Sequence, residues 1–113
     1  MDERVINELE NWKNRFSELL KLLDHAEGGD LIKVVSNRYS QLKEDLLQRE
    51  KELEKAEAKG ILSATERDIL APAVREAALH CTAPKGSTNE QKLSSALYDG
   101  EDYLSYYLDQ LNA

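Results

Sequence analysis

The sequence predicts an all-α protein, an antiparallel helical bundle of about four helices built on a long N-terminal helical hairpin. Leu, Glu, Ala and Lys are the most frequent residues and all favour helices, whereas the 113 residues include only five glycines and two prolines. Four segments carry apolar residues at intervals of three and four, and glycine, proline or capping signals separate them. We expect one domain over residues 1–113, with residues 1–60 forming the hairpin and residues 61–113 closing the bundle.

The first expected helix, residues 2–26, carries a strict heptad stripe. Intervals of four and three alternate between its apolar residues, which is typical of a helix that buries one seam. We expect this seam to face the chain's own later helices, with Trp12 in the core; the alternative is a homodimer through the first two helices. Asp2 should favour the positive end of the helix dipole, and left-handed Gly28 and Gly29 should end the helix. The stripe consists of Val5, Leu9, Trp12, Phe16, Leu19 and Leu23.

The second expected helix, residues 31–59, should begin at an Asp30 N-cap and end at Gly60. Its apolar stripe is interrupted at Arg49, and the residues from Gln48 onward are almost entirely polar. We therefore expect this helix to begin buried and to end exposed, with its charged end projecting past the first helix. The link between the two helices is short, so they should run antiparallel.

The third expected helix opens with a capping box made by Ser63 and Glu66 and continues to Cys81. Pro72 lies inside it. Because proline lacks a backbone donor and clashes with the preceding turn, it predicts a kink or break near Leu70. Residues 82–89, TAPKGSTN, are typical of a loop.

The fourth expected helix runs to about residue 111, and Ser87 with Glu90 offers a second capping box at its start. Gly100 falls on its apolar stripe, where a large residue is expected. Glycine there costs about 1 kcal/mol relative to alanine. This position predicts a close helix crossing; the alternative is a break between two short helices.

The net charge of −7 is concentrated at the two ends of the chain. Residues 1–29 contribute −3 and residues 87–113 contribute −4, whereas the middle is neutral and no basic stripe exists. We therefore expect no direct binding to nucleic acid, and a nucleic-acid mimic would have to use the ends. The lone Cys81, the charged N-terminal residues and the lack of a long apolar run indicate a cytoplasmic protein that does not bind membranes.

No catalytic, cofactor-binding or metal-binding motif is visible, so we expect a protein that is not an enzyme and has no cofactor. His25 is interpreted as a helix C-terminal residue, His80 as a surface histidine and Cys81 as a buried structural thiol. An enzyme or sensor centred on Cys81 or the histidines is the alternative.

The most unusual stretch, SALYDGEDYLSYYLDQL, contains four of the five tyrosines, with acids between them. Tyrosine is amphipathic and is enriched at protein interfaces. A tyrosine-and-acid surface suits a partner protein with a basic surface; the alternative is that the tyrosines edge the core with their hydroxyls in water. The candidate partner-binding residues are Tyr98, Asp99, Glu101, Asp102, Tyr103 and Tyr106.

These observations predict a small non-enzymatic protein that acts by binding another protein. Such a protein could serve as a regulator or inhibitor, an immunity-like factor or an adaptor. The alternative, based on the heptad stripe, is a coiled-coil structural or assembly subunit that forms a homodimer.

Overall fold

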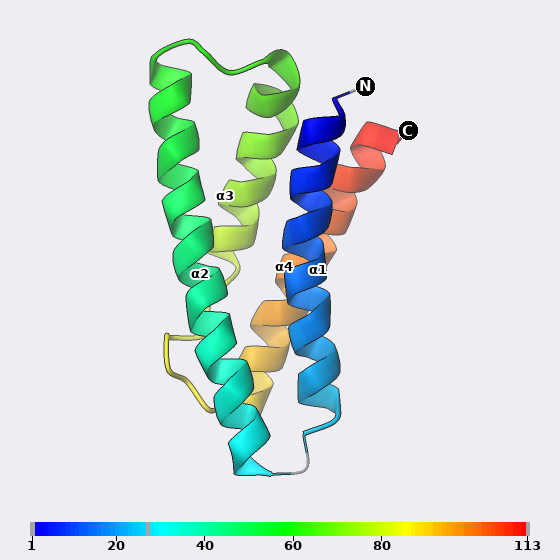
Figure 1. Ribbon diagram of the computed structural model, residues 1–113, viewed down its shortest axis with the longest axis vertical. Coiled ribbons are helices and arrows are strands. Elements are labelled where there is room, and N and C mark those ends of the chain that lie inside the picture. The colour runs from blue at the N-terminus through cyan, green and yellow to red at the C-terminus, as the bar shows by residue number, and fades with distance from the viewer. Residues whose placement is uncertain (1, 27, 113) are drawn as a thin grey trace.

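The computed structural model describes residues 2–26 and 28–112 and confirms the all-α bundle (Figure 1). Its elements are α1 (Glu3–Asp24), α2 (Gly29–Ala58), the π-helical segment η1 (Glu66–Leu70), α3 (Ala71–Leu79) and α4 (Glu90–Asn112). The helices alternate in direction along the chain, and the molecule measures 47 × 28 × 16 Å.

The predicted hairpin of α1 and α2 is present, but its two helices are splayed apart (Figure 1). α1 packs mainly against α4, whereas α2 packs mainly against α3. One continuous core joins the four helices, because each directs its apolar stripe inward. The largest fully buried side chains include Leu9, Phe16, Tyr39, Leu42, Leu46, Leu70, Leu93, Leu97 and Leu104.

The heptad stripe of α1 therefore faces the chain's own helices, with Val5, Leu9 and Phe16 at most 2% exposed. The prediction that Trp12 is a core residue is wrong, because its side chain is only half-buried at the edge of the core. α2 ends exposed, as predicted: after Leu53 its last residues are mainly in solvent. Its start differs from the prediction, because residues 29–34 are exposed or half-buried and the buried stripe begins only at Val35.

The link between α1 and α2 differs from the prediction. α1 ends at Asp24 with His25 as its C-cap, and Gly28 is extended, with φ −171°, instead of left-handed. Gly28 occupies the N-cap position of α2 without a side-chain hydrogen bond, so Asp30 lies in the first turn and is not the cap. An acid inside the first turn still stabilises the helix through the dipole.

Gly60 ends α2 as predicted. It has φ +69°, the left-handed conformation that glycine adopts without steric cost. The Gly60 N–H donates to the carbonyl of Glu57, and the Ile61 N–H donates to that of Ala56. This pair of hydrogen bonds is a Schellman motif, which satisfies two carbonyls at the helix end.

Replacing Gly60 with alanine is expected to lower the free energy of unfolding by about 1 kcal/mol, because an alanine Cβ disfavours the left-handed conformation. Open space surrounds the site, so no clash adds to this cost. Urea titration would measure the change. Gly29→Ala is the control, because Gly29 has equally open surroundings and no positive φ, and that variant should lose no stability. Equal losses in both variants would contradict this account.

Pro72 distorts the third helix at the predicted place but does not break it. The segment η1 widens the helix immediately before α3, and the Ala71 N–H donates to the carbonyl of Glu66, five residues back. Pro72 itself occupies the first turn of α3. A π-helical turn lets a helix continue where its regular hydrogen-bond pattern is interrupted.

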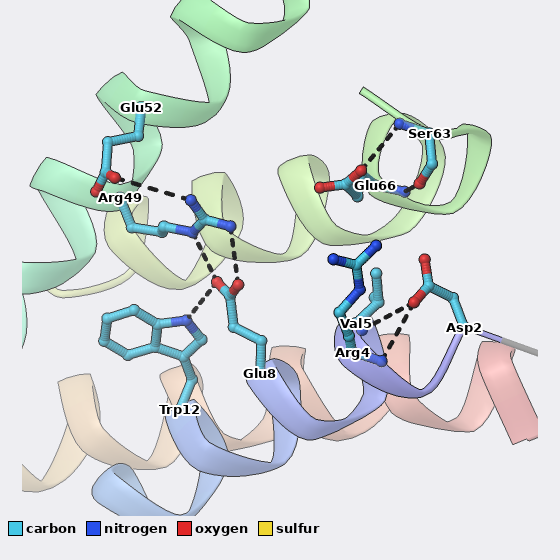
Figure 2. Close-up of polar contacts among 9 residues, drawn as sticks. All are labelled: Asp2, Arg4, Val5, Glu8, Trp12, Arg49, Glu52, Ser63 and Glu66. Atoms are coloured by element: carbon cyan, nitrogen blue, oxygen red, sulfur yellow. Dashed lines mark hydrogen bonds and ion pairs between the residues drawn. The ribbon is translucent and has the colours of Figure 1, made fainter. Parts of the chain in front are cut away.

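One of the two predicted capping boxes is present. The Ser63 N–H donates to the Glu66 carboxylate at 2.9 Å, and the Glu66 N–H donates to the Ser63 hydroxyl at 3.1 Å (Figure 2). The second prediction is wrong: Asn89 caps α4, its side-chain oxygen accepting from the Lys92 N–H. Ser87 instead accepts a hydrogen bond from the Asn89 N–H.

Gly100 marks a close helix crossing, as predicted, and α4 continues through it without a break. Its backbone rests on the ring of Phe16 in α1. A Cβ placed on Gly100 would lie 2.7 Å from Cδ1 of that ring and closer still to its outer carbons. Only glycine lets the two helices approach to this degree.

Candidate functional site

Five of the six candidate residues lie on the outer side of α4. Tyr98, Asp102 and Tyr106 are four residues apart and follow one line along the helix, with Asp99 and Tyr103 beside them. Tyr98 is 64% exposed and Tyr106 is 57% exposed, which is unusual for rings of this size. We call these five residues the tyrosine–acid face.

A surface depression of about 440 Å³ gathers most of this face against the end of α3. Asp99, Asp102, Tyr103 and Tyr106 line it from α4, and His80 lines it from the C-terminus of α3. Tyr98 lies further along α4, where it lines a neighbouring hollow that also includes Asp99. The structure therefore combines two carboxylates with three aromatic rings in one concave site.

His80 is the residue of this site that sequence reasoning missed. The sequence indicates a surface histidine, but the His80 ring stacks on Tyr103, with centroids 4.3 Å apart and planes 14° apart. Its Nε2 atom lies 3.6 Å from the Glu76 carboxylate, and 31% of the side chain is exposed. The contact depends on how α3 and α4 align, so no spacing in the sequence could reveal it.

Tyr106 contacts an aromatic neighbour in the sequence. Tyr107 meets it edge to face, with ring centroids 5.2 Å apart and planes at 85°. Tyr107 is half-buried, and burial is the main cause that raises the pKa of its hydroxyl. The edge-to-face contact restricts the Tyr106 ring while leaving much of it in solvent.

Glu101 does not join the depression. Its side chain is turned toward α1, where it accepts a hydrogen bond of 2.8 Å from the hydroxyl of Ser17. Glu101 lies on the side of α4 that borders the α1 contact, whereas the tyrosine–acid face lies on the outer side. Its observed role is to link two helices.

A second polar cluster bridges the splayed helices α1 and α2 (Figure 2). Arg49 donates two hydrogen bonds of 2.9 Å to Glu8, which also accepts one of 3.1 Å from the indole of Trp12. These bonds to Glu8 are the main cause that raises the pKa of Arg49. The arginine that interrupts the apolar stripe of α2 is thus a structural link to α1.

The same cluster continues along α1. The guanidinium carbon of Arg15 lies 5.3 Å from the centre of the Trp12 ring, which is the geometry of a cation–π contact. Arg15 also forms a 2.9 Å ion pair with Asp45 of α2. An aromatic ring and a carboxylate therefore hold one arginine side chain between them.

Cys81 is buried, as predicted, and is 2% exposed. Burial raises the pKa of its thiol from 9.0 to about 11, although the Lys43 ammonium and the Tyr39 hydroxyl oppose this shift. That Tyr39 hydroxyl donates to the Ala83 carbonyl at 2.8 Å, and Lys43 donates to the same oxygen at 3.1 Å. Such surroundings favour a structural thiol, since nucleophilic cysteines need a lowered pKa and access.

The raised pKa predicts a pH effect on stability. Since the folded protein holds the Cys81 proton more tightly than the unfolded chain does, its contribution is fully present below pH 9.0 and is lost as the pH rises to about 11. Urea midpoints across this range should fall more in the wild type than in Cys81→Ala. Parallel curves would contradict the prediction. Native Cys81 should also react slowly with iodoacetamide near neutral pH and rapidly in denaturant.

Residues 2–26 and 28–112 contain neither a cluster of metal ligands nor a helix suited to a membrane. No group of three or more His, Cys, Asp or Glu side chains in these residues could hold a metal ion. None of the helices described is both long and apolar enough to cross a membrane.

Known proteins give no direct guide to this chain. No protein-family model matches it, and neither a curated protein nor a solved structure does.

Proposed function

We propose that this protein is a non-enzymatic binding protein whose tyrosine–acid face docks on a basic surface of a partner protein. The observation that carries the proposal is the concave site of Asp99, Asp102, Tyr103 and Tyr106 against His80. Large exposed rings supply contact area at low entropic cost, and carboxylates supply complementarity to a positive partner.

The charge of the chain supports the same kind of partner. The segment from residue 87 to residue 113 carries five acids and one lysine, and it includes the whole of α4. Negative charge on this helix steers a positively charged protein toward the face and repels nucleic acid. We place this activity in the cytoplasm, where a single unpaired cysteine is expected to stay reduced. Regulator, inhibitor, immunity-like factor and adaptor all fit this mode of action.

The alternative of a homodimeric coiled-coil subunit has weaker support. It relied on the heptad stripe of α1, and the chain's own helices cover that stripe almost completely. A dimer would have to use other surfaces of the bundle. Sedimentation equilibrium at micromolar concentration would test it, and a stable dimer would revive this alternative.

The proposed docking face is tested by affinity capture from the native lysate. The wild type, a tyrosine variant and a control variant are each immobilised, and the proteins that bind to each are quantified by mass spectrometry. The variant Tyr98→Ala/Tyr106→Ala removes the two exposed rings. The matched control Val34→Ala/Leu47→Ala removes two exposed apolar side chains of α2, which are 40% and 39% exposed. We expect the tyrosine variant to lose a partner that the wild type and the control both retain.

The exposed position of Tyr98 and Tyr106 means that the variant should keep its helicity and melting temperature, which circular dichroism would verify. A partner set that is unchanged by the tyrosine substitutions would reject the proposed face. A loss shared equally by the control would do the same, because it would show that the effect is not specific to α4.

A further inference from the structure

We propose that the depression between α3 and α4 accepts an arginine side chain of the partner, with its guanidinium against Tyr106 and paired with Asp99 and Asp102. This inference rests on the proposed function and specifies the chemistry of the partner. Three features of the site support it: its carboxylates, its rings and an arrangement of the same kind elsewhere in the molecule.

The two carboxylates of the depression form no ion pair with a positively charged side chain in the part of the chain that the structure describes. None of the ion pairs found between described residues involves Asp99 or Asp102. Both aspartates are exposed, and the lining of the depression includes neither lysine nor arginine among the described residues. Two negative groups that share one concave site attract a cation, and a guanidinium can donate to both at once.

The aromatic rings select the shape of that cation. Tyr103 is stacked on His80 and Tyr106 is held edge to face by Tyr107, so both rings are restrained before any partner arrives. A planar guanidinium stacks on an aromatic face and remains free to donate in its own plane. The ammonium of lysine is compact and strongly hydrated, so it gains less from such a surface.

The protein already contains an arginine held in this manner. On the opposite side of the bundle, Arg15 lies over the ring of Trp12 and pairs with the carboxylate of Asp45. That cluster is complete within one chain. The depression presents a ring and carboxylates but no arginine. We infer that the partner supplies this arginine.

Titration with blocked five-residue peptides would test the inference, with amide chemical shifts of the labelled protein as the readout. Each peptide has glycine at four positions and either arginine, lysine or citrulline at the centre; citrulline keeps the shape of arginine without its charge. We expect the arginine peptide to shift the amides of residues 99–106 and to bind about tenfold more tightly than the lysine peptide, with no binding of the citrulline peptide.

Variants locate the binding. The double substitution Asp99→Asn/Asp102→Asn should lower the affinity for the arginine peptide by about tenfold or more. The matched control Asp24→Asn/Asp30→Asn removes the same charge from two exposed acids outside the depression and should leave the affinity nearly unchanged. Tyr106→Ala should reduce the preference for arginine over lysine.

Equal binding of the arginine and lysine peptides would overturn the inference, because the site would then be a general cation surface. Equal weakening by the two aspartate variants, or shifts confined to residues away from His80 and residues 99–106, would overturn it as well. Failure of this inference can be distinguished from failure of the proposed function. If the lysate contains a partner whose binding depends on Tyr98 and Tyr106, but the arginine peptide does not bind, only the inference is rejected. If the proteins captured from the lysate do not change when Tyr98 and Tyr106 are replaced, the proposed docking face itself is rejected.

Discussion

Replacing Gly100 with alanine is expected to destabilise the protein by about 1–3 kcal/mol, although alanine is the better helix former. In an open helix the same change would stabilise by about 1 kcal/mol. Here the added methyl group would enter the ring of Phe16, which is itself fully buried. The ring cannot move outward into solvent, so α1 and α4 must separate or the core must repack.

Thermal and urea unfolding of the Gly100→Ala variant would measure this loss. The decisive comparison adds Phe16→Leu, which removes the outer part of the ring. If the clash is the cause, Gly100→Ala should cost much less in the Phe16→Leu background than in the wild type, as a double-mutant cycle reports. Additive effects of the two substitutions would contradict the close approach of these helices.

Replacing Glu8 with alanine is expected to cost roughly 1–3 kcal/mol, because the carboxylate accepts three hydrogen bonds from Arg49 and Trp12. The side chains of Glu8 and Arg49 are only 27% and 28% exposed, so water replaces these bonds incompletely. Loss of Glu8 leaves the partly buried guanidinium of Arg49 without its main partner. An unpaired charge that is partly shielded from water lowers the free energy of unfolding.

Trp12 provides a direct readout of this change. It is the only tryptophan in the chain, so its fluorescence reports the α1–α2 bridge alone. We expect its emission to shift to the red in Glu8→Ala, together with a lower urea midpoint. Glu10→Ala is the control, since Glu10 is exposed on the same helix, and it should change neither quantity. A silent Glu8→Ala variant would show that the bridge is dispensable.

Several features of the fold could be predicted because they are local. The Ser63–Glu66 capping box and the stop at Gly60 each depend on a few consecutive residues. The two capping errors were also local, and each came from neighbouring residues that compete for one capping position. Asn89 took the capping position predicted for Ser87, and Gly28 took the one predicted for Asp30.

The candidate site divides in the same way. The tyrosines and acids of α4 stand out in the sequence, and helical spacing places Tyr98, Asp102 and Tyr106 on one line. The spacing does not say what lies opposite that line. The neighbour of Tyr103 is His80, and the neighbour of Glu101 is Ser17, which is 84 residues away in the chain.

The sequence by itself determined the four helices and most of the residues that each buries, because apolar spacing and capping act within a few turns of one helix. Only the tertiary structure decided that α1 rests on α4 at Gly100, that Arg49 and Glu8 bridge the splayed hairpin, and that His80 completes a concave site. These contacts join segments that are far apart in sequence, and they depend on the angles and registers at which the helices pack.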